Sequence, residues 1–94
     1  TGISGSAAEK VGLKLKEVSK NRQVLCVTHQ AQIAALADYH YLIQKQVEQG
    51  RTFTSVGLLD HDGRKNELAR IIGGVNITEA ALSHAESMLL QYDN

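Results

Sequence analysis

The stretch Gln23–His29, which reads QVLCVTH, is the one around which the chain is organised. Its four consecutive apolar residues, from Val24 to Val27, favour a strand buried on both faces of a parallel sheet. In open α/β sheets, ligands bind beyond the carboxyl ends of the strands, and Thr28 and His29 follow the strand at that end. The sequence therefore predicts a buried strand with a titratable imidazole directly after its carboxyl end.

Length and composition limit the classes of protein that need to be considered. The 94 residues suffice for one small domain. Ten basic and ten acidic residues give zero formal charge, so the chain lacks the basic field that attracts nucleic acid. The single cysteine, Cys26, excludes a disulfide framework within one chain and is expected to be a buried thiol. Because no signal peptide or membrane-spanning run occurs, we expect a cytoplasmic protein with no membrane partner.

Two observations predict that the chain is a piece of a longer protein. It has no initiator methionine and begins with Thr-Gly-Ile-Ser-Gly. In addition, one buried strand cannot form a parallel sheet, so its neighbours would have to come from other residues. The unpaired strand over residues 24–27 also predicts self-association or strand exchange when the piece is isolated.

Periodicity and turn residues predict four helices and an antiparallel hairpin in addition to the strand. The helices are expected over residues 6–20, 30–37 and 66–72 and from 78 onward, and the hairpin strands over 39–47 and 52–59. The first helix is expected to bury Ala8, Val11, Leu15 and Val18, and the last Leu82, Ala85, Leu89 and Tyr92. The predicted fold class is α/β, with a buried strand plus a β-hairpin packed with helices.

His29 is the main candidate for chemistry, because an imidazole can donate a proton to an anionic ligand or polarise a water molecule. No serine or cysteine nucleophile accompanies it, and a structural or solvated loop histidine is the alternative. Zinc would require Cys26 and several histidines, but no pair has the spacing of a closed site. The turn Asp60–Gly63 has two acids of a calcium loop but lacks the third.

Three motifs in a fixed order carry a family resemblance. They are TGISGSAA at residues 1–8, VLCVTHQAQIAALAD at 24–38 and ELARIIGG at 67–74. Together they resemble the carboxyl-terminal end of the RecN family, SMC-like ABC-type ATPases of bacterial DNA repair. The implied fold is the carboxyl-terminal part of a P-loop ATPase head that follows the Walker B motif. The head portion would span residues 1–94, with a D-loop region at 1–8, a switch-histidine loop at 23–30 and carboxyl-terminal helices at 64–92.

The resemblance implies roles for particular residues. His29 matches the switch histidine, which is expected to contact the γ-phosphate of ATP and help to place the attacking water. Thr1, Gly2, Ser4 and Gly5 match the D-loop region, which is expected to meet a second head when two heads enclose ATP. The Walker A lysine, the Walker B acids and the signature motif have no match in these residues. These 94 residues alone are therefore expected to be inactive.

The resemblance also implies what the whole protein does. It would be an ATPase acting in recombinational repair of DNA double-strand breaks, with its heads forming a homodimer and DNA bound through the full-length protein. Its cofactors would be ATP and Mg, held mainly by residues outside this chain, and it would associate with the nucleoid during repair. The alternative is a non-catalytic α/β interaction or dimerisation module in which His29 is structural.

Overall fold

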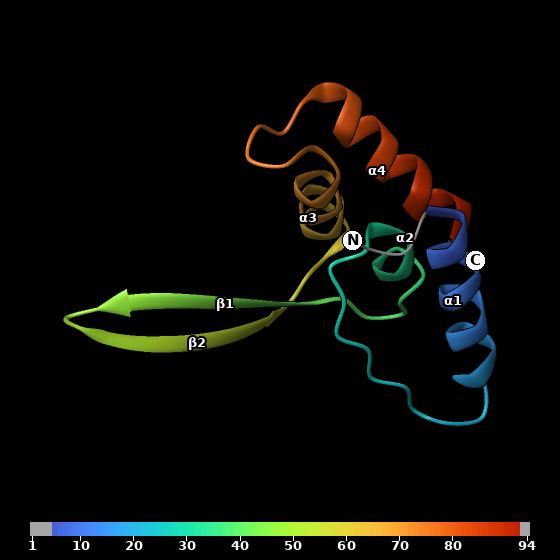
Figure 1. Cartoon of the computed structure of the whole chain (residues 1–94), viewed down its shortest axis with the longest axis horizontal. Coiled ribbons are helices and arrows are strands. Elements are labelled where there is room, and N and C mark those ends of the chain that lie inside the picture. The colour runs from blue at the N-terminus through green and yellow to red at the C-terminus, as the bar shows by residue number, and fades with distance from the viewer. Residues whose placement is uncertain (1–4, 93–94) are drawn as a thin grey trace.

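The computed structural model describes residues 5–92 of the chain. This part forms an α/β arrangement of four helices and one antiparallel hairpin. The helices are α1 Gly5–Val18, α2 Ala31–Ala34, α3 His61–Gly73 and α4 Glu79–Tyr92, and the strands are β1 Tyr41–Glu48 and β2 Arg51–Leu58. In Figure 1 the helices lie together and the hairpin extends away from them as an arm. The arm explains a radius of gyration of 14.3 Å, which exceeds the ~12 Å typical of a compact chain of this length.

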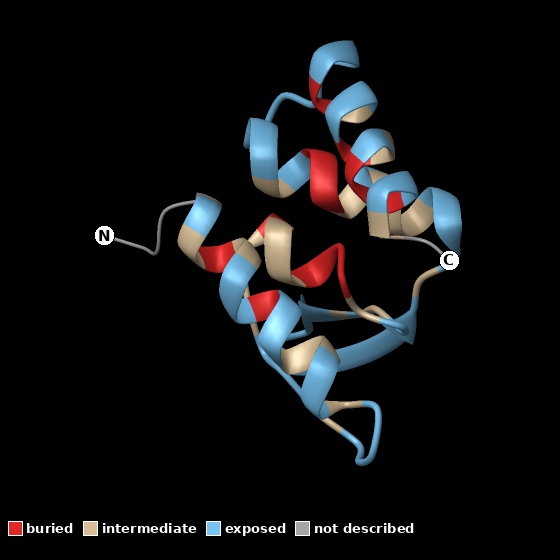
Figure 2. Ribbon diagram, turned by 90° about the vertical axis from the view of Figure 1, so that its right-hand side faces the viewer, coloured by how far each residue is buried: buried red, intermediate tan, exposed pale blue. Residues whose placement is uncertain are grey.

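The core lies between α3, α4 and the short α2. Leu68 is fully buried, and small or apolar side chains from the three helices pack around it. The buried cluster comprises Ala31, Ala34, Ala35, Leu68, Ala69, Ala81, Ala85, Met88 and Leu89. Figure 2 shows the buried positions on the facing sides of the helices, whereas the two strands are exposed. The many alanines at these contacts let the helices approach closely.

Local capping fixes the ends of α3 and α4. The Asp60 carboxylate accepts a hydrogen bond from the Gly63 amide at 2.8 Å, so the predicted turn is in fact the start of α3. The helix therefore begins earlier than the sequence predicts. Gly74, with a φ of 76°, ends α3 as the glycine pair predicts. The Thr78 hydroxyl accepts from the Ala81 amide at 3.1 Å, which confirms the predicted start of the last helix.

The hairpin confirms the predicted strand pair and turn. The strands pair in register from Tyr41 opposite Leu58 to Glu48 opposite Arg51. The turn residues Gln49 and Gly50 both have positive φ, as a two-residue turn matched to the strand twist requires. The prediction that the hairpin packs with helices is wrong. Every residue of β2 is exposed, and so is every residue of β1 except Leu42, because the described helices cover neither face of the arm.

The predicted buried strand at residues 24–27 is also wrong. The segment has no strand conformation, and Leu25 and Val27 are 87% and 85% exposed. Cys26 is exposed as well, and not the buried thiol that the sequence predicts. The physical reason is that a strand needs a hydrogen-bonded neighbour, and the two strands of the described part pair only with each other.

The helix α1 contacts its neighbours through a narrower face than predicted. Ala8 is buried and Leu15 half-buried, but Val11 and Val18 are 41% and 37% exposed. Gly12 is buried in place of the larger residues, because α1 faces the short α2 rather than a broad core. The predicted face of α4 is confirmed: Ala85 and Leu89 are buried, and Leu82 and Tyr92 pack against the core. No helix among residues 5–92 is long and apolar enough to span a membrane.

Candidate functional site: the His29 loop and α2

The imidazole of His29 lies on the exposed loop directly before α2. The preceding Thr28 hydroxyl accepts a hydrogen bond from the Gln30 amide at 2.9 Å, which bends the chain around His29. The Gln30 carbonyl then accepts from the Ala34 amide at 3.0 Å and opens α2. Within residues 5–92, no side chain hydrogen-bonds to the His29 ring, so the ring is available to a ligand. The position beside a turn and a helix agrees with the predicted loop, although no strand precedes it.

The short helix α2 is held from two sides. On the side of α1, Gly12 allows close approach: a Cβ at this position would lie 2.4 Å from Leu36 Cδ1 and 3.5 Å from Ile33 Cα. On the side of α3, the Arg64 guanidinium donates hydrogen bonds to backbone carbonyls at the end of α2, the shortest to Ala37 at 2.9 Å. The loop that carries His29 therefore continues into an element fixed by two other helices.

Most of the predicted D-loop residues cannot be placed relative to His29. Thr1, Gly2 and Ser4 lie outside the described residues, and Gly5 is the first residue of α1. The rest of the predicted region, residues 6–8, belongs to the first turns of α1. The roles of these residues therefore stay predictions from the resemblance.

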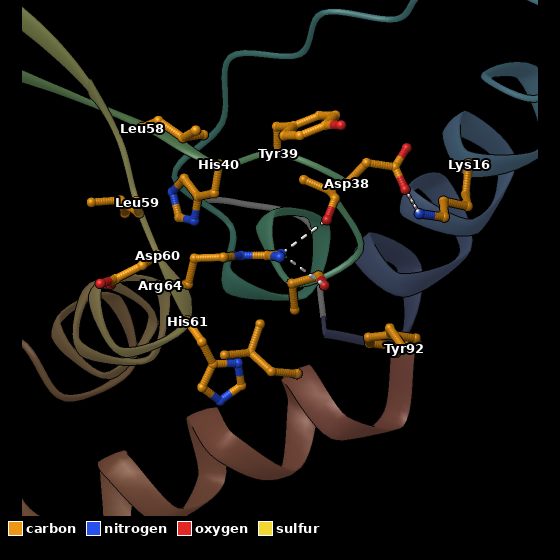
Figure 3. A pocket seen from close by; sticks show the side chains of 13 residues that line it. Lys16, Asp38, Tyr39, His40, Leu58, Leu59, Asp60, His61, Arg64 and Tyr92 are labelled. Carbon is orange, nitrogen blue, oxygen red and sulfur yellow. Dashed lines mark hydrogen bonds and ion pairs between the residues drawn. The ribbon is translucent and has the colours of Figure 1, made fainter. Parts of the chain in front are cut away.

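A cleft of ≈ 370 Å³ lies where the base of the hairpin meets the helices. Figure 3 shows Arg64 at its centre, between His40 and His61, with the ion pair of Lys16 and Asp38 at one side. The lining residues are Lys16, Ala35, Ala37, Asp38, Tyr39, His40, Leu58, Leu59, Asp60, His61, Arg64, Leu89 and Tyr92. Lys16 pairs with Asp38 and His61 pairs with Glu86, while Asp60 and Arg64 hydrogen-bond to backbone groups. The cleft therefore acts as a junction between elements, with no set of groups arranged for catalysis.

Two side chains that line the cleft have shifted pKa values. Burial and the positive charge of Arg64 lower the pKa of His40, while Glu67 opposes the shift. The His40 Nδ1 atom is buried with no hydrogen-bond partner among the described residues. Burial and a hydrogen bond to Glu9 at 2.5 Å raise the pKa of Tyr92 to about 12. Both groups are therefore neutral near pH 7, and Tyr92 ties α4 to α1 through its hydroxyl.

The remaining candidate chemistries find no support. Among residues 5–92, no three of the His, Cys, Asp and Glu side chains gather closely enough to hold a metal ion. The histidines considered for zinc are dispersed: His40 and His61 line the cleft, whereas His29 lies on its loop and His84 on α4. The calcium-like turn is the amino-terminal cap of α3, where Asp60 already accepts a backbone amide.

The sequence did not predict Arg64 as part of the His29 region. It is separated from the carbonyls that it binds by 27 to 30 residues, and it lies between the predicted turn at residues 60–63 and the helix predicted over residues 66–72. A local signal was Asp60, a residue type favoured at the N-cap, which would have placed Arg64 on the first turn of a helix.

Comparison with known proteins found similar sequences with one name. The chain is 52% identical over 88 residues to the "DNA repair protein RecN" of Deinococcus radiodurans, an alignment that covers 94% of this chain and 15% of that protein. It is 42% identical over 93 residues to the protein of that name from Bacillus subtilis, covering 99% of this chain and 16% of the relative. The protein of that name from Vibrio cholerae is 42% identical over 89 residues, with 95% and 16% covered.

The chain thus spans 15–16% of the length of the curated relatives that it matches. No family model matches it.

Proposed function

Because the chain belongs to the RecN family and matches the carboxyl-terminal segment of its members, we propose that it forms the carboxyl-terminal portion of an ATP-binding head in a DNA repair protein. In this proposal the head is an SMC-like ABC-type ATPase that acts on DNA double-strand breaks at the bacterial nucleoid. Residues 23–30 supply the switch-histidine loop, residues 1–8 the D-loop region, and residues 64–92 the supporting helices.

The exposed ring of His29 is the observation that carries the proposal. A γ-phosphate sensor must present a donor to solvent on a backbone that is held in place, and His29 has both properties. Its ring is not engaged by another side chain within residues 5–92, while the Thr28 turn and α2 hold its backbone.

The proposed chemistry needs little from this chain beyond position and charge. Phosphoryl transfer is accelerated mainly by orienting the reactants and by stabilising the charge on the transferred group. An imidazole N–H can donate to a γ-phosphate oxygen and can orient the attacking water at the same time. The D-loop region, Thr1, Gly2, Ser4 and Gly5, would complete the site from a second head, which would couple hydrolysis to dimer formation.

ATP and Mg would be bound mainly by residues outside this chain. The sequence has no glycine-rich phosphate loop with its lysine, and residues 5–92 offer no cluster of metal ligands. His29 is the group that fits the triphosphate, as a single donor at its outer end. Bound ATP and Mg would supply the phosphoryl group and the charge that neutralises it.

The test is steady-state ATP hydrolysis by the full-length protein that carries His29→Ala. We expect the kcat to fall about 100-fold, the magnitude typical of losing one preorganised donor, with a smaller change in KM. The matched control is His84→Ala, which removes an exposed histidine from α4 and is expected to leave turnover unchanged. An unchanged kcat in the His29→Ala protein would refute the role of His29.

The alternative, a non-catalytic interaction module, is favoured by the exposed apolar residues. Tyr41, Ile43 and Val56 share one face of the hairpin and are 53–63% exposed, and Leu25 and Val27 are exposed on the loop. Such surface predicts self-association of the isolated chain. Light scattering over a range of concentrations measures it, and a monomer at high concentration would argue against this prediction.

The two proposals differ when the missing part of the head is added. Under the first, mixing this chain with the preceding segment of the protein restores ATP binding, which titration with a fluorescent ATP analogue measures. Under the second, the chain self-associates and the mixture does not bind the nucleotide.

A further inference from the structure

The short helix α2 depends on its neighbours for its position. It comprises only Ala31–Ala34, and an isolated helix of this length is unstable in water because nucleation costs more than the few hydrogen bonds return. Of the preceding residues 23–27, all except the half-buried Val24 are exposed, and none lies in a helix or strand that could anchor α2. The position of His29 therefore follows from whatever holds α2 on its other sides.

One such contact comes from α3. The two N–H groups of Arg64 Nη2 are shared among three carbonyl oxygens, those of Ala37 at 2.9 Å, Ala34 at 3.3 Å and Ala35 at 3.4 Å. The Ala34 carbonyl also accepts from the Ala37 amide at 3.2 Å. Carbonyls at the end of a helix carry partial negative charge, so a guanidinium is well suited to them. Figure 3 shows the Arg64 side chain reaching across the cleft to this turn.

Arg64 reaches out from a rigid platform. Its own backbone amide donates to the Asp60 carbonyl at 2.8 Å in the first turn of α3. From the same helix, His61 and Lys65 both contact the Glu86 carboxylate on α4, at 2.5 Å and 3.7 Å. Further along α3, the fully buried Leu68 packs in the core cluster with side chains of α4. The guanidinium is thus fixed relative to the core, and α2 is fixed relative to the guanidinium.

We propose that Arg64 is a positioning residue for His29: by holding the end of α2, it sets where the imidazole stands. This inference rests on the proposed function of His29 as a phosphate sensor. In this proposal Arg64 acts through the backbone of residues 34–37, to which its Nη2 atom donates, and does not itself touch the ligand. Gly12 also helps to position α2, because the absence of a side chain there allows α1 and α2 to lie in close contact.

The test is a double-mutant cycle on ATP hydrolysis by the full-length protein, with Arg64→Gln, His29→Ala and the double variant. Arg64→Gln is expected to lower kcat about tenfold with KM for ATP changed less than about twofold, because a misplaced group loses most of its effect. In the His29→Ala background, Arg64→Gln should cause no further loss, because there is no imidazole left to misplace. Arg64→Lys, which retains the charge and three donors, should recover part of the kcat.

Arg70→Gln is the matched control. Arg70 lies on the same helix but pairs with Glu67 on its own helix at 2.6 Å, and it does not contact α2. Its removal is expected to leave kcat unchanged. Hydrogen exchange provides the structural readout: Arg64→Gln should speed exchange in residues 31–37 while α4 stays protected. If α4 loses protection as well, Arg64→Lys replaces Arg64→Gln in the cycle.

The outcomes separate the two proposals. If His29→Ala leaves kcat unchanged, the proposed function fails, whatever Arg64→Gln does. If His29→Ala lowers kcat but Arg64→Gln does not, the proposed function stands and the positioning role of Arg64 is overturned. Equal losses from Arg64→Gln with and without His29 would also overturn it, because the effect would not pass through the imidazole.

Discussion

The α3–α4 pair and the β-hairpin adjoin in the sequence, yet they bury their apolar side chains to opposite extents. Leu68 on α3 is fully buried, whereas Val47 on β1 is 72% exposed. The two helices supply each other with an apolar surface, but a two-stranded sheet has two faces and nothing in the described chain covers either. The comparison teaches that burial depends on an opposing surface from another element and not on apolar content alone.

The largest expected effect concerns the packed α3–α4 pair. Leu68→Ala should lower the free energy of unfolding by about 2–5 kcal/mol, because a fully buried leucine leaves both lost transfer energy and a cavity. Urea denaturation followed by circular dichroism measures the change.

The matched control is the same substitution on the hairpin. Leu58 is 57% exposed, so Leu58→Ala should change stability by less than about 0.5 kcal/mol. Similar losses from the two variants would show that the hairpin is packed in solution, which would contradict the difference between the two regions.

A smaller effect is expected where α1 meets α2. Gly12→Ala gains about 1 kcal/mol of helix propensity. The new Cβ, however, would lie 2.4 Å from Leu36 Cδ1. Leu36 is itself buried, and overpacking of this kind costs typically about 1–3 kcal/mol, so we expect a net loss of about 1 kcal/mol. Thermal unfolding monitored by circular dichroism measures it.

Gly57→Ala is the control for this substitution. Gly57 lies in β2, and a Cβ there would have no atom within 4 Å. The free energy of unfolding of the Gly57→Ala variant should stay the same or rise slightly. If Gly12→Ala also raised the stability, the close contact between α1 and α2 would not be needed for the fold.

Much of the fold could be predicted because its signals are local. The two-residue turn at Gln49 and Gly50, the glycine that ends α3 and the Thr78 cap all act within a few residues of the chain. The strand at residues 24–27 failed because pairing is a non-local property, and an apolar run does not specify a partner. Arg64 could not be predicted beside His29 for the same reason, since its partners are 27–30 residues away.

The smallest expected effect concerns His40, where the two regions join. The Leu59 amide donates to the His40 carbonyl at 2.9 Å at the base of the hairpin, and the ring faces Arg64 across the cleft. Burial and the Arg64 charge lower the pKa of His40, with Glu67 acting in the opposite direction. The folded state therefore favours the neutral ring. Its contribution to stability is complete above the unfolded pKa, about 6.5, and is lost as the pH falls through the lowered folded value.

His40→Gln should remove this part of the acid sensitivity, because glutamine stays neutral. As the pH falls below about 6.5, we expect the free energy of unfolding of the parent chain to fall more steeply than that of the variant. Urea titrations at several pH values measure the two slopes, and His84→Gln on the exposed face of α4 should keep the parent slope. Parallel curves for the parent and His40→Gln would show that protonation of the His40 ring does not lower the free energy of unfolding. The ring would then be solvated, and the hairpin would be joined to the helices more loosely than the cleft around Arg64 implies.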